Sequence, residues 1–567
     1  MAEATEMGED MLMIAVEQAE AALPGLLEAQ ITDPSSPDLG AAFYGETGVP
    51  YLPTSLLATA IPLIACHRSR YHRDKQLAQR AQLAAEACLR RQEPDGTISM
   101  LDCNFHSPPD TAFVVEALGP ALALMRRAGL PELEPASRAL ETFLARTGPA
   151  LLTGGIHTPN HRWVMVAALA WLHRLFGDEA FVARAEEWLA EGFDITADGE
   201  WTERSNAIYN VVCASALTTA GLLLNRPELF EPVRRNLRRM VYFVHPDGEI
   251  VTETSHRQDA GERFSLSRYY RAYRFLAAID RDPLFAAMAD WARALGGTCS
   301  LLDELLYPEL DAAGVPRAPL PERYAVQFGR AHAYPDLPRV FHYEKPRHRY
   351  TPEAPVVRER RSDVSLTVLG EHPHFLSFRA GEARLIGVRV IPAYFGCGPF
   401  RFPAIVAEDG RYVLEREWTA WYNGPLPREA RIPSGRWAEM DHRRRPLDHS
   451  GRLLIRCEIV PRDDGFDLTV SASGPPRCPV QVAFLFDPAG AFEPTPSLQA
   501  TDDGSFLLIE GSATFSQGRD RLVVSGARSS HRMAVLRGDE PRHGTRNLLI
   551  NALTPMSETY TVRRAHR

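Results

Sequence analysis

Hydrophobic residues along this chain of 567 residues follow one spacing in the first half and another in the second. Up to about residue 300 they recur every three to four positions, which is the spacing of one buried face of an α-helix. The segments with this spacing include 75–91, 110–127, 161–176, 180–189, 208–224, 229–244 and 266–279. Because such segments follow one another without strand-like alternation, we predict that the first half is entirely helical.

From about residue 362 the hydrophobic residues fall in short runs rich in β-branched and aromatic side chains, which Gly, Pro and Asp interrupt. The clearest runs are 364–369, 375–379, 411–418, 453–460 and 522–524. Runs of this kind predict β-strands. Residues 306–355, rich in Pro, Arg and Tyr, have weak periodicity and are typical of a linker. We therefore predict two domains, a helical one at 1–330 and a β-rich one at 331–567.

An Asp-Gly pair recurs between the end of one predicted helix and the start of the next, at 95–96, 198–199 and 247–248. A repeat of this kind suggests helical hairpins stacked into an α/α toroid, with every Asp-Gly loop on the same rim. The residues that would then meet at that rim are Asn160, His161, Tyr209, His256 and Arg257. Asp-Gly also marks ordinary turns, which would account for the pattern more simply.

Composition argues against several classes of protein. A formal net charge of -9 and a pI near 6.1, with no dense tract of Lys and Arg, argue against a nucleic-acid partner. The eight cysteines are scattered and include no Cys-x-x-Cys, which is compatible with a reducing compartment. The N-terminal segment is acidic, unlike a signal peptide, and no apolar run is long enough to span a bilayer. We expect a cytoplasmic protein with neither nucleic acid nor membrane as a partner.

Three short motifs carry groups suited to one reaction. Asn160 and His161 open an apolar helix in the run Thr-Pro-Asn-His-Arg-Trp, and Tyr209 opens another after Asp-Gly-Glu-Trp-Thr-Glu. His372 lies in Glu-His-Pro-His, where the β-rich half begins. An amide, a phenol and imidazoles are the groups that stabilise a carboxylate enolate and move protons around it. This set favours β-elimination at a uronate.

The order and approximate spacing of these motifs resemble the polysaccharide lyases of the heparinase II/III and oligoalginate lyase group. The resemblance implies an α+β protein of several domains, with an incomplete α/α toroid followed by an antiparallel β-sandwich. It further implies that Asn160, beside His161, hydrogen-bonds the substrate carboxylate, so that charge can flow into it in the transition state. Tyr209 would donate a proton to the departing sugar and, in a syn elimination, also act as base. In an anti elimination the base would be His161 or His372.

The sequence gives no support for a metal site in the second domain. In these lyases the second histidine of such a pair, here His374, can ligate a structural zinc together with an Asp and another His. Where the group would place that Asp, residues 385–391 of this chain contain no carboxylate. We therefore expect no cofactor.

Further polar residues near the Asp-Gly loops are candidates for sugar binding. Asn104 and His106 lie in the loop after the first pair, and His256 and Arg257 follow the third. Arg204 or Arg257 could pair with a uronate carboxylate through two parallel hydrogen bonds. We expect this set to contact a uronate-containing oligo- or polysaccharide.

The same residues would also suit different roles. Asn160 could simply cap its helix, and Tyr209 could belong to the core. A hydrolase on the same toroid, such as one that removes unsaturated uronyl residues, would need a carboxylate pair, for example Asp110 with Asp198 or Glu203. A uronyl C5-epimerase would share the proton abstraction but keep the glycosidic bond. We favour a lyase acting on a uronic acid of the glucuronate type, because an Asn-His pair and a Tyr suit elimination better than hydrolysis.

Overall fold

The computed structural model describes residues 2–43, 48–156, 158–329, 355–542 and 544–565. They form two compact units, a helical one that ends at Leu320 and a β-rich one that holds 321–329 and the described residues from Pro355 onward. The predicted domain boundary at residue 330 lies outside the described residues.

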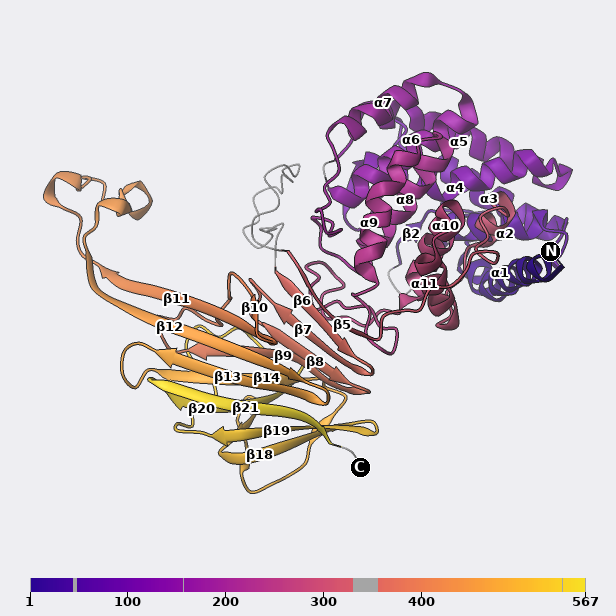
Figure 1. Cartoon of the computed structure of the whole chain (residues 1–567). Coiled ribbons are helices and arrows are strands. Elements are labelled where there is room, and N and C mark those ends of the chain that lie inside the picture. The colour runs from indigo at the N-terminus through magenta and orange to yellow at the C-terminus, as the bar shows by residue number, and fades with distance from the viewer. Residues whose placement is uncertain (1, 44–47, 157, 330–354, 543, 566–567) are drawn as a thin grey trace. The chain divides into compact units, whose positions relative to one another are not determined.

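Within the described residues, twelve α-helices make up most of the helical unit (Figure 1). They are α1 Ala2–Ala29, α2 Thr54–Ala65, α3 Lys75–Arg90, α4 Pro108–Ala128, α5 Glu134–Thr153, α6 Pro159–Phe176, α7 Glu179–Ala190, α8 Tyr209–Leu223, α9 Phe230–Met240, α10 Tyr270–Asp280, α11 Pro283–Ala294 and α12 Leu301–Leu306. Neighbouring helices pack as hairpins, α2 with α3, α4 with α5, α6 with α7 and α8 with α9. The first helix of each hairpin also packs on the first helix of the next. The result is the double-layered stack of an α/α toroid.

The two layers differ in how much of each helix is apolar. In α6, of the inner layer, 14 of the 18 residues are buried, because helices surround it. In α3, of the outer layer, the buried residues form one stripe that includes Leu77, Ala81 and Ala84. The start of α3 is fixed by Asp74, whose side chain accepts a 2.8 Å hydrogen bond from the N–H of Leu77.

The three Asp-Gly turns share one set of hydrogen bonds. In each, the residue two before the Asp donates its N–H to the carbonyl of the residue after the Gly, and its own carbonyl accepts the Gly N–H. The glycines have left-handed φ values of 85°, 88° and 86°. A Cβ at Gly96 or Gly199 would lie 2.0 or 2.3 Å from the carbonyl oxygen of Arg146 in α5 or Arg235 in α9. The pattern therefore marks a structural repeat, whose first two turns pack closely against an outer helix.

Four short strands among the described residues correct the prediction of an entirely helical first half. β1 Ala42–Phe43 pairs with β2 Pro50–Tyr51, and β3 Ile98–Met100 pairs with β4 Asn104–Ser107. Asn104 and His106 therefore lie on a strand and not in a loop. Runs of two to four residues are too short to show the alternation that reveals a strand in a sequence.

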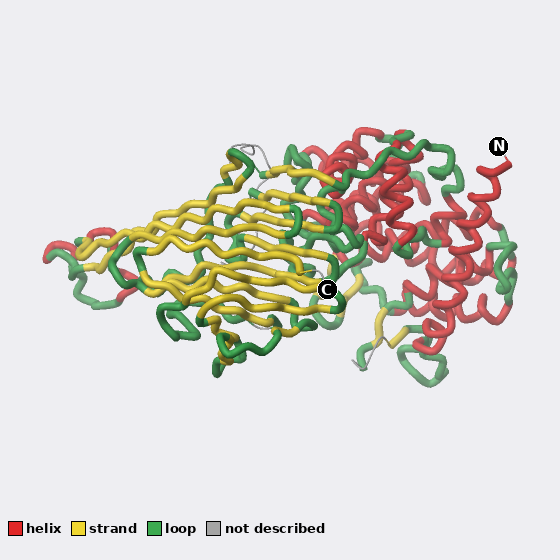
Figure 2. The backbone as a smooth tube through the Cα atoms, turned by 60° about the horizontal axis from the view of Figure 1, so that its bottom comes forward, coloured by secondary structure: helices red, strands yellow, loops and turns green. Residues whose placement is uncertain are grey.

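The β-rich unit is a sandwich of two sheets, whose strands run side by side in Figure 2. One sheet has the order β10-β11-β12-β13-β21-β19-β18-β15, and the other β16-β17-β20-β14-β9-β8-β7-β6-β5. The strands are β5 Arg323–Phe328, β6 Val356–Arg361, β7 Val364–Leu369, β8 Leu376–Ala380, β9 Ala383–Pro392, β10 Val406–Glu408, β11 Arg411–Asn423, β12 Leu447–Arg462, β13 Gly465–Ser473, β14 Pro479–Phe486, β15 Ala491–Phe492, β16 Leu498–Ala500, β17 Phe506–Leu508, β18 Glu510–Gln517, β19 Asp520–Arg528, β20 Arg546–Leu553 and β21 Met556–Ala565. Neighbouring strands pair antiparallel, except β17 with β20. Strand β12 shows why the sheets pack face to face, since Leu453, Ile455 and Cys457 are buried and alternate with more exposed residues.

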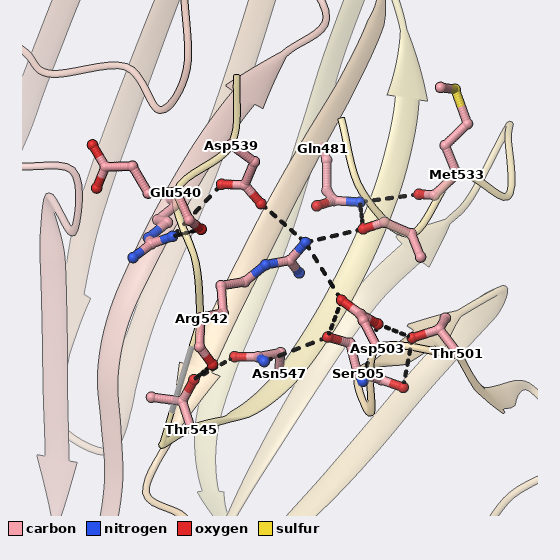
Figure 3. Close-up of polar contacts among 12 residues, drawn as sticks. Gln481, Thr501, Asp503, Ser505, Met533, Asp539, Glu540, Arg542, Thr545 and Asn547 are labelled. Carbon is pink, nitrogen blue, oxygen red and sulfur yellow. Dashed lines mark hydrogen bonds and ion pairs between the residues drawn. The ribbon is translucent and has the colours of Figure 1, made fainter. Parts of the chain in front are cut away.

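The β-rich unit contains a group of charged side chains, here called the sheet cluster, which consists of Arg389, Asp503, Asp539 and Arg542. Figure 3 shows three of them, Asp503, Asp539 and Arg542. Arg542 Nη2 lies 3.0 Å from Asp539 Oδ2 and 3.9 Å from Asp503 Oδ2. Asp539 Oδ1 lies 3.6 Å from Nη1 of Arg389, on β9. The side chains of Arg542 and Asp539 are only 5% and 2% exposed. Burial raises the pKa of Asp539, although Arg542 and Arg389 lower it.

Strands β11 and β12 continue past the body of their sheet as a two-stranded ribbon (Figure 1). Their pairing extends to Asn423 and Leu447, with an irregularity between Ala420 and Tyr422. The tip, residues 424–446, is built from short 3-10 turns and has almost no buried side chains. None of the described helices is long and apolar enough to cross a membrane.

Candidate active site at the helix starts of the toroid

Asn160 and Glu203 lie at the centre of the candidate site. Thr158 is the N-cap residue of α6 and Pro159 begins the helix, so the alternative that Asn160 is its N-cap is wrong. The Asn160 side chain donates to both oxygens of Glu203, at 2.8 and 2.7 Å, and its backbone N–H donates to Glu203 Oε2 at 3.2 Å. The Glu203 carboxylate, from the loop before α8, thus accepts a hydrogen bond from one of the backbone N–H groups that have no partner within the first turn of α6. Asn160 itself is fully buried.

Arg257 extends this pair toward Tyr209. Its Nη1 forms a close ion pair with Glu203 Oε1, and its guanidinium carbon lies 4.6 Å from the centre of the Tyr209 ring. The Tyr209 hydroxyl donates to Gln258 Oε1 at 3.2 Å. The side chain of Arg257 is 21% exposed, while that of Glu203 is 1% exposed. We call Asn160, Glu203, Arg257 and Tyr209 the rim cluster.

A buried aspartate holds the loop that leads to Tyr209. Asp259 accepts hydrogen bonds of 2.9 Å from the hydroxyls of Ser205 and Ser255 and from the N–H of Ala207. Ser205 in turn accepts the N–H of Tyr209 at 3.1 Å and so fixes the first turn of α8. Asp259 was not predicted from the sequence, because a lone Asp in a loop carries no motif.

His161 is a half-buried imidazole next to this cluster. Its ring meets that of Phe113 edge-on, with 5.6 Å between the ring centres. Among the described residues, its buried Nδ1 has no hydrogen-bond partner. Burial lowers the pKa of His161, Asp110 raises it and Arg257 lowers it. The imidazole is therefore neutral at neutral pH and able to accept a proton.

The residues around the first Asp-Gly turn divide into two groups. Asn104 donates to Asp110 Oδ2 at 2.9 Å, and this aspartate interacts electrostatically with His161. His106 is exposed and its Nδ1 lies 2.9 Å from Oδ2 of Asp95, in the turn itself. The structure thus links Asn104 to the site through Asp110 and ties His106 to its own turn.

Arg204 has an internal partner. Its side chain is 2% exposed, and its Nε lies 3.6 Å from Oε1 of Glu200. Its φ of 50° lies in the left-handed region, and its carbonyl accepts the N–H of His256 at 2.7 Å. This geometry gives Arg204 a role in joining two loops and leaves Arg257 as the arginine with an accessible side chain.

The histidine pair His372 and His374 belongs to the β-rich unit. The N–H of His374 donates to His372 Nδ1 at 3.1 Å, and the two rings meet edge-on. Burial and, to a smaller extent, the nearby charges of Arg389, His372 and Arg401 lower the pKa of His374 to about 2. Positive neighbours do not suit a zinc ligand. The described residues contain no group of three or more His, Cys, Asp or Glu that could hold a metal ion.

Comparison with known proteins shows the fold of this chain. No family model and no curated protein sequence matches it. Among solved structures, a heparinase III matches with a TM-score of 0.51 and 10% identity, over 97% of this chain and 84% of that one. A heparan sulfate lyase from Pedobacter heparinus and a chondroitin AC lyase from Streptomyces coelicolor A3 have TM-scores of 0.41 and 0.44, at 11% and 13% identity, over 99% and 98% of this chain and 88% and 80% of theirs.

The match to the heparinase III shows that the chain has the fold of that polysaccharide lyase. The predicted architecture, an α/α toroid followed by an antiparallel β-sandwich, is confirmed. Identities near 10% carry no information on the reaction, which has to be argued from the side chains.

Proposed function

We propose that this protein is a lyase that cleaves the glycosidic bond next to a uronic acid, of the glucuronate type, by β-elimination. The observation that carries the proposal is the rim cluster, which brings the cation of Arg257 onto the phenol ring of Tyr209, with the neutral imidazole of His161 beside it. These are the groups that elimination requires.

The first step is removal of the proton at C5 of the uronate. Arg257 binds the substrate carboxylate and stabilises the charge that flows into it as the C5–H bond breaks. Asn160 is buried, so its part is to hold both oxygens of Glu203 and, through them, the position of Arg257. Neutral His161 accepts the proton. His372, in the β-rich unit, is the other candidate for this base.

The second step breaks the bond between C4 and the glycosidic oxygen. The electron pair left at C5 forms the C4–C5 double bond, and the Tyr209 hydroxyl donates its proton to the departing oxygen. Proton transfer from His161 to Tyr209, directly or through solvent, restores both groups. The products are a 4,5-unsaturated uronate and a sugar with a free hydroxyl.

The geometry gives less support to a hydrolase. Glu203 is held by Asn160 and Arg257, Asp198 lies 3.6 Å from Arg239, and Asp110 accepts from Asn104 and Ser107. All three carboxylates have structural partners, whereas a hydrolase needs one to act as acid and another as base or nucleophile.

The test is the ultraviolet absorbance of the unsaturated uronate, measured with a panel of uronate-containing glycans. Tyr209→Phe should lower kcat/KM by about 10² to 10⁴, the usual contribution of a general acid. Tyr71→Phe, which changes a tyrosine that stacks with Arg70, is the matched control. New reducing ends without absorbance would indicate a hydrolase, and deuterium uptake at C5 without cleavage an epimerase.

A further inference from the structure

The helical unit contains a partly open cavity of about 750 Å³ that the proposed reaction does not use. Its walls come from α1, α2, α4, α6, α8, α12, the start of α10 and the segments just before α10 and α12. A volume of this size is typical of a small-molecule site.

The walls combine the groups that bind sugars. Hydroxyl groups come from Ser55, Thr59, Ser215 and Ser300. Phe113, Trp171 and Tyr307 contribute aromatic surface, on which the C–H face of a pyranose can pack. Arg271, Arg268, Asp303 and Glu116 supply two cations and two carboxyl groups. The walls carry groups of both signs, which suits a polyhydroxylated ligand better than a strongly charged one.

Glu116, on α4, is a carboxyl group of this cavity that forms no hydrogen bond within the described part of the chain. It interacts electrostatically with Arg271 and Asp303. Burial raises the pKa of Glu116 to about 7, which Arg271 opposes and Asp303 favours. At neutral pH a large fraction of these carboxyl groups is therefore protonated and can both donate and accept a hydrogen bond.

The wall facing Glu116 is rigid. Arg271 Nε lies 2.9 Å from Asp303 Oδ1, and its Nη1 donates to Ser215 Oγ at 3.1 Å. Asp303 also completes a capping box with Ser300 at the start of α12. A guanidinium and a carboxylate fixed in this way can each engage two neighbouring hydroxyls of a sugar without reorganising.

The cavity adjoins the candidate active site at two points. Phe113, one turn before Glu116, lines it and contacts the ring of His161. Ile208, which also lines it, directly precedes Tyr209. We propose that this cavity binds a sugar unit of the substrate next to the cleaved bond, with Glu116 hydrogen-bonding its hydroxyls. The proposal rests on the proposed function only for the class of ligand.

The test is calorimetric titration of Tyr209→Phe protein, which keeps the ligand intact, with tetrasaccharides from the uronate panel. Glu116→Leu added to this background should weaken binding at least tenfold. Glu116→Gln, which keeps a donor and an acceptor, should stay within about threefold of the parent. Glu141→Gln, an exposed change on α5, is the control. Thermal unfolding confirms that each variant is folded.

The outcomes separate this proposal from the proposed function. Binding that depends on Glu116, together with a wild type that has no lyase activity on the same glycans, would retain the cavity site and overturn the lyase. If the wild type is a lyase but Glu116→Leu binds as tightly as its parent, the lyase is retained and the cavity site is overturned. If no tetrasaccharide binds, or if Glu116→Gln weakens binding as much as Glu116→Leu does, the cavity site is wrong.

Discussion

The rim cluster and the sheet cluster both hold a buried carboxylate between polar partners, yet they are built for different tasks. Burial raises the pKa of Glu203 and of Asp539, even though arginines lower both. The difference lies in the cations. The side chain of Arg257 is 21% exposed, whereas those of Arg389 and Arg542 are 5% exposed. One cluster can therefore present a charge to a ligand, while the other can only stabilise the fold.

The largest effect is expected from Arg542→Ala in the sheet cluster. Removing one partner leaves Asp539 buried with less compensation, and the free energy of unfolding should fall by about 3 to 5 kcal/mol. Urea unfolding measures this loss, and lyase activity per folded molecule should stay unchanged. If activity is lost while the protein is fully folded, the sheet cluster is not purely structural.

Arg257→Gln in the rim cluster should show the opposite pattern. The loss of the cation should lower kcat/KM by about 10² to 10³. The free energy of unfolding should fall less than in Arg542→Ala, because Asn160 still donates to both oxygens of Glu203. Arg263→Gln is the matched control, because Arg263 pairs with Glu249 at 2.8 Å but its side chain is 65% exposed. If the two substitutions had equal effects on kcat/KM, Arg257 would not bind the substrate.

The pH dependence of stability should be similar in the two clusters. A carboxyl whose pKa is raised by folding takes up its proton more readily in the native state. Its contribution to stability is therefore complete below the ordinary pKa, 4.5 for Glu203 and 3.8 for Asp539, and is lost as pH rises through the raised value. Compared with Glu203→Gln and Asp539→Asn, the wild type should lose stability over that interval. Urea unfolding at a series of pH values measures this, and a wild type that instead gains stability relative to the variants as the pH rises would contradict it.

The smallest expected effect concerns the acid limb of the activity profile. Because burial lowers the pKa of His161, the decline of kcat/KM on acidification should lie below the ordinary value of 6.5. His161→Gln should remove this limb together with most of the activity. A limb that persists in the variant would favour His372 as the base.

The sequence revealed more of the fold than of the site. The periodicity predicted β7 at its observed bounds and placed α3 and α7 within one residue at each end, because packing on one face leaves a regular pattern. The Asp-Gly repeat was visible because only Gly can approach the outer helices so closely. Asn160, His161 and Tyr209 were found as residues, but the link from Asn160 through Glu203 to Arg257 joins the start of α6 to two separate loops. No local pattern encodes such a contact, and Glu116 is one polar residue on an apolar helix.

The β11–β12 ribbon has a practical consequence. Among the described residues, the hydrogen bonds and ion pairs made by side chains of the tip, such as Arg444 to Glu429 and Arg445 to the Gly424 carbonyl, remain within it. The long pairing of β11 with β12 joins the two strands independently of the tip. A protease that cleaves residues 424–446 should therefore leave the sandwich assembled, and a reporter domain inserted there should report on the intact protein without disturbing its core.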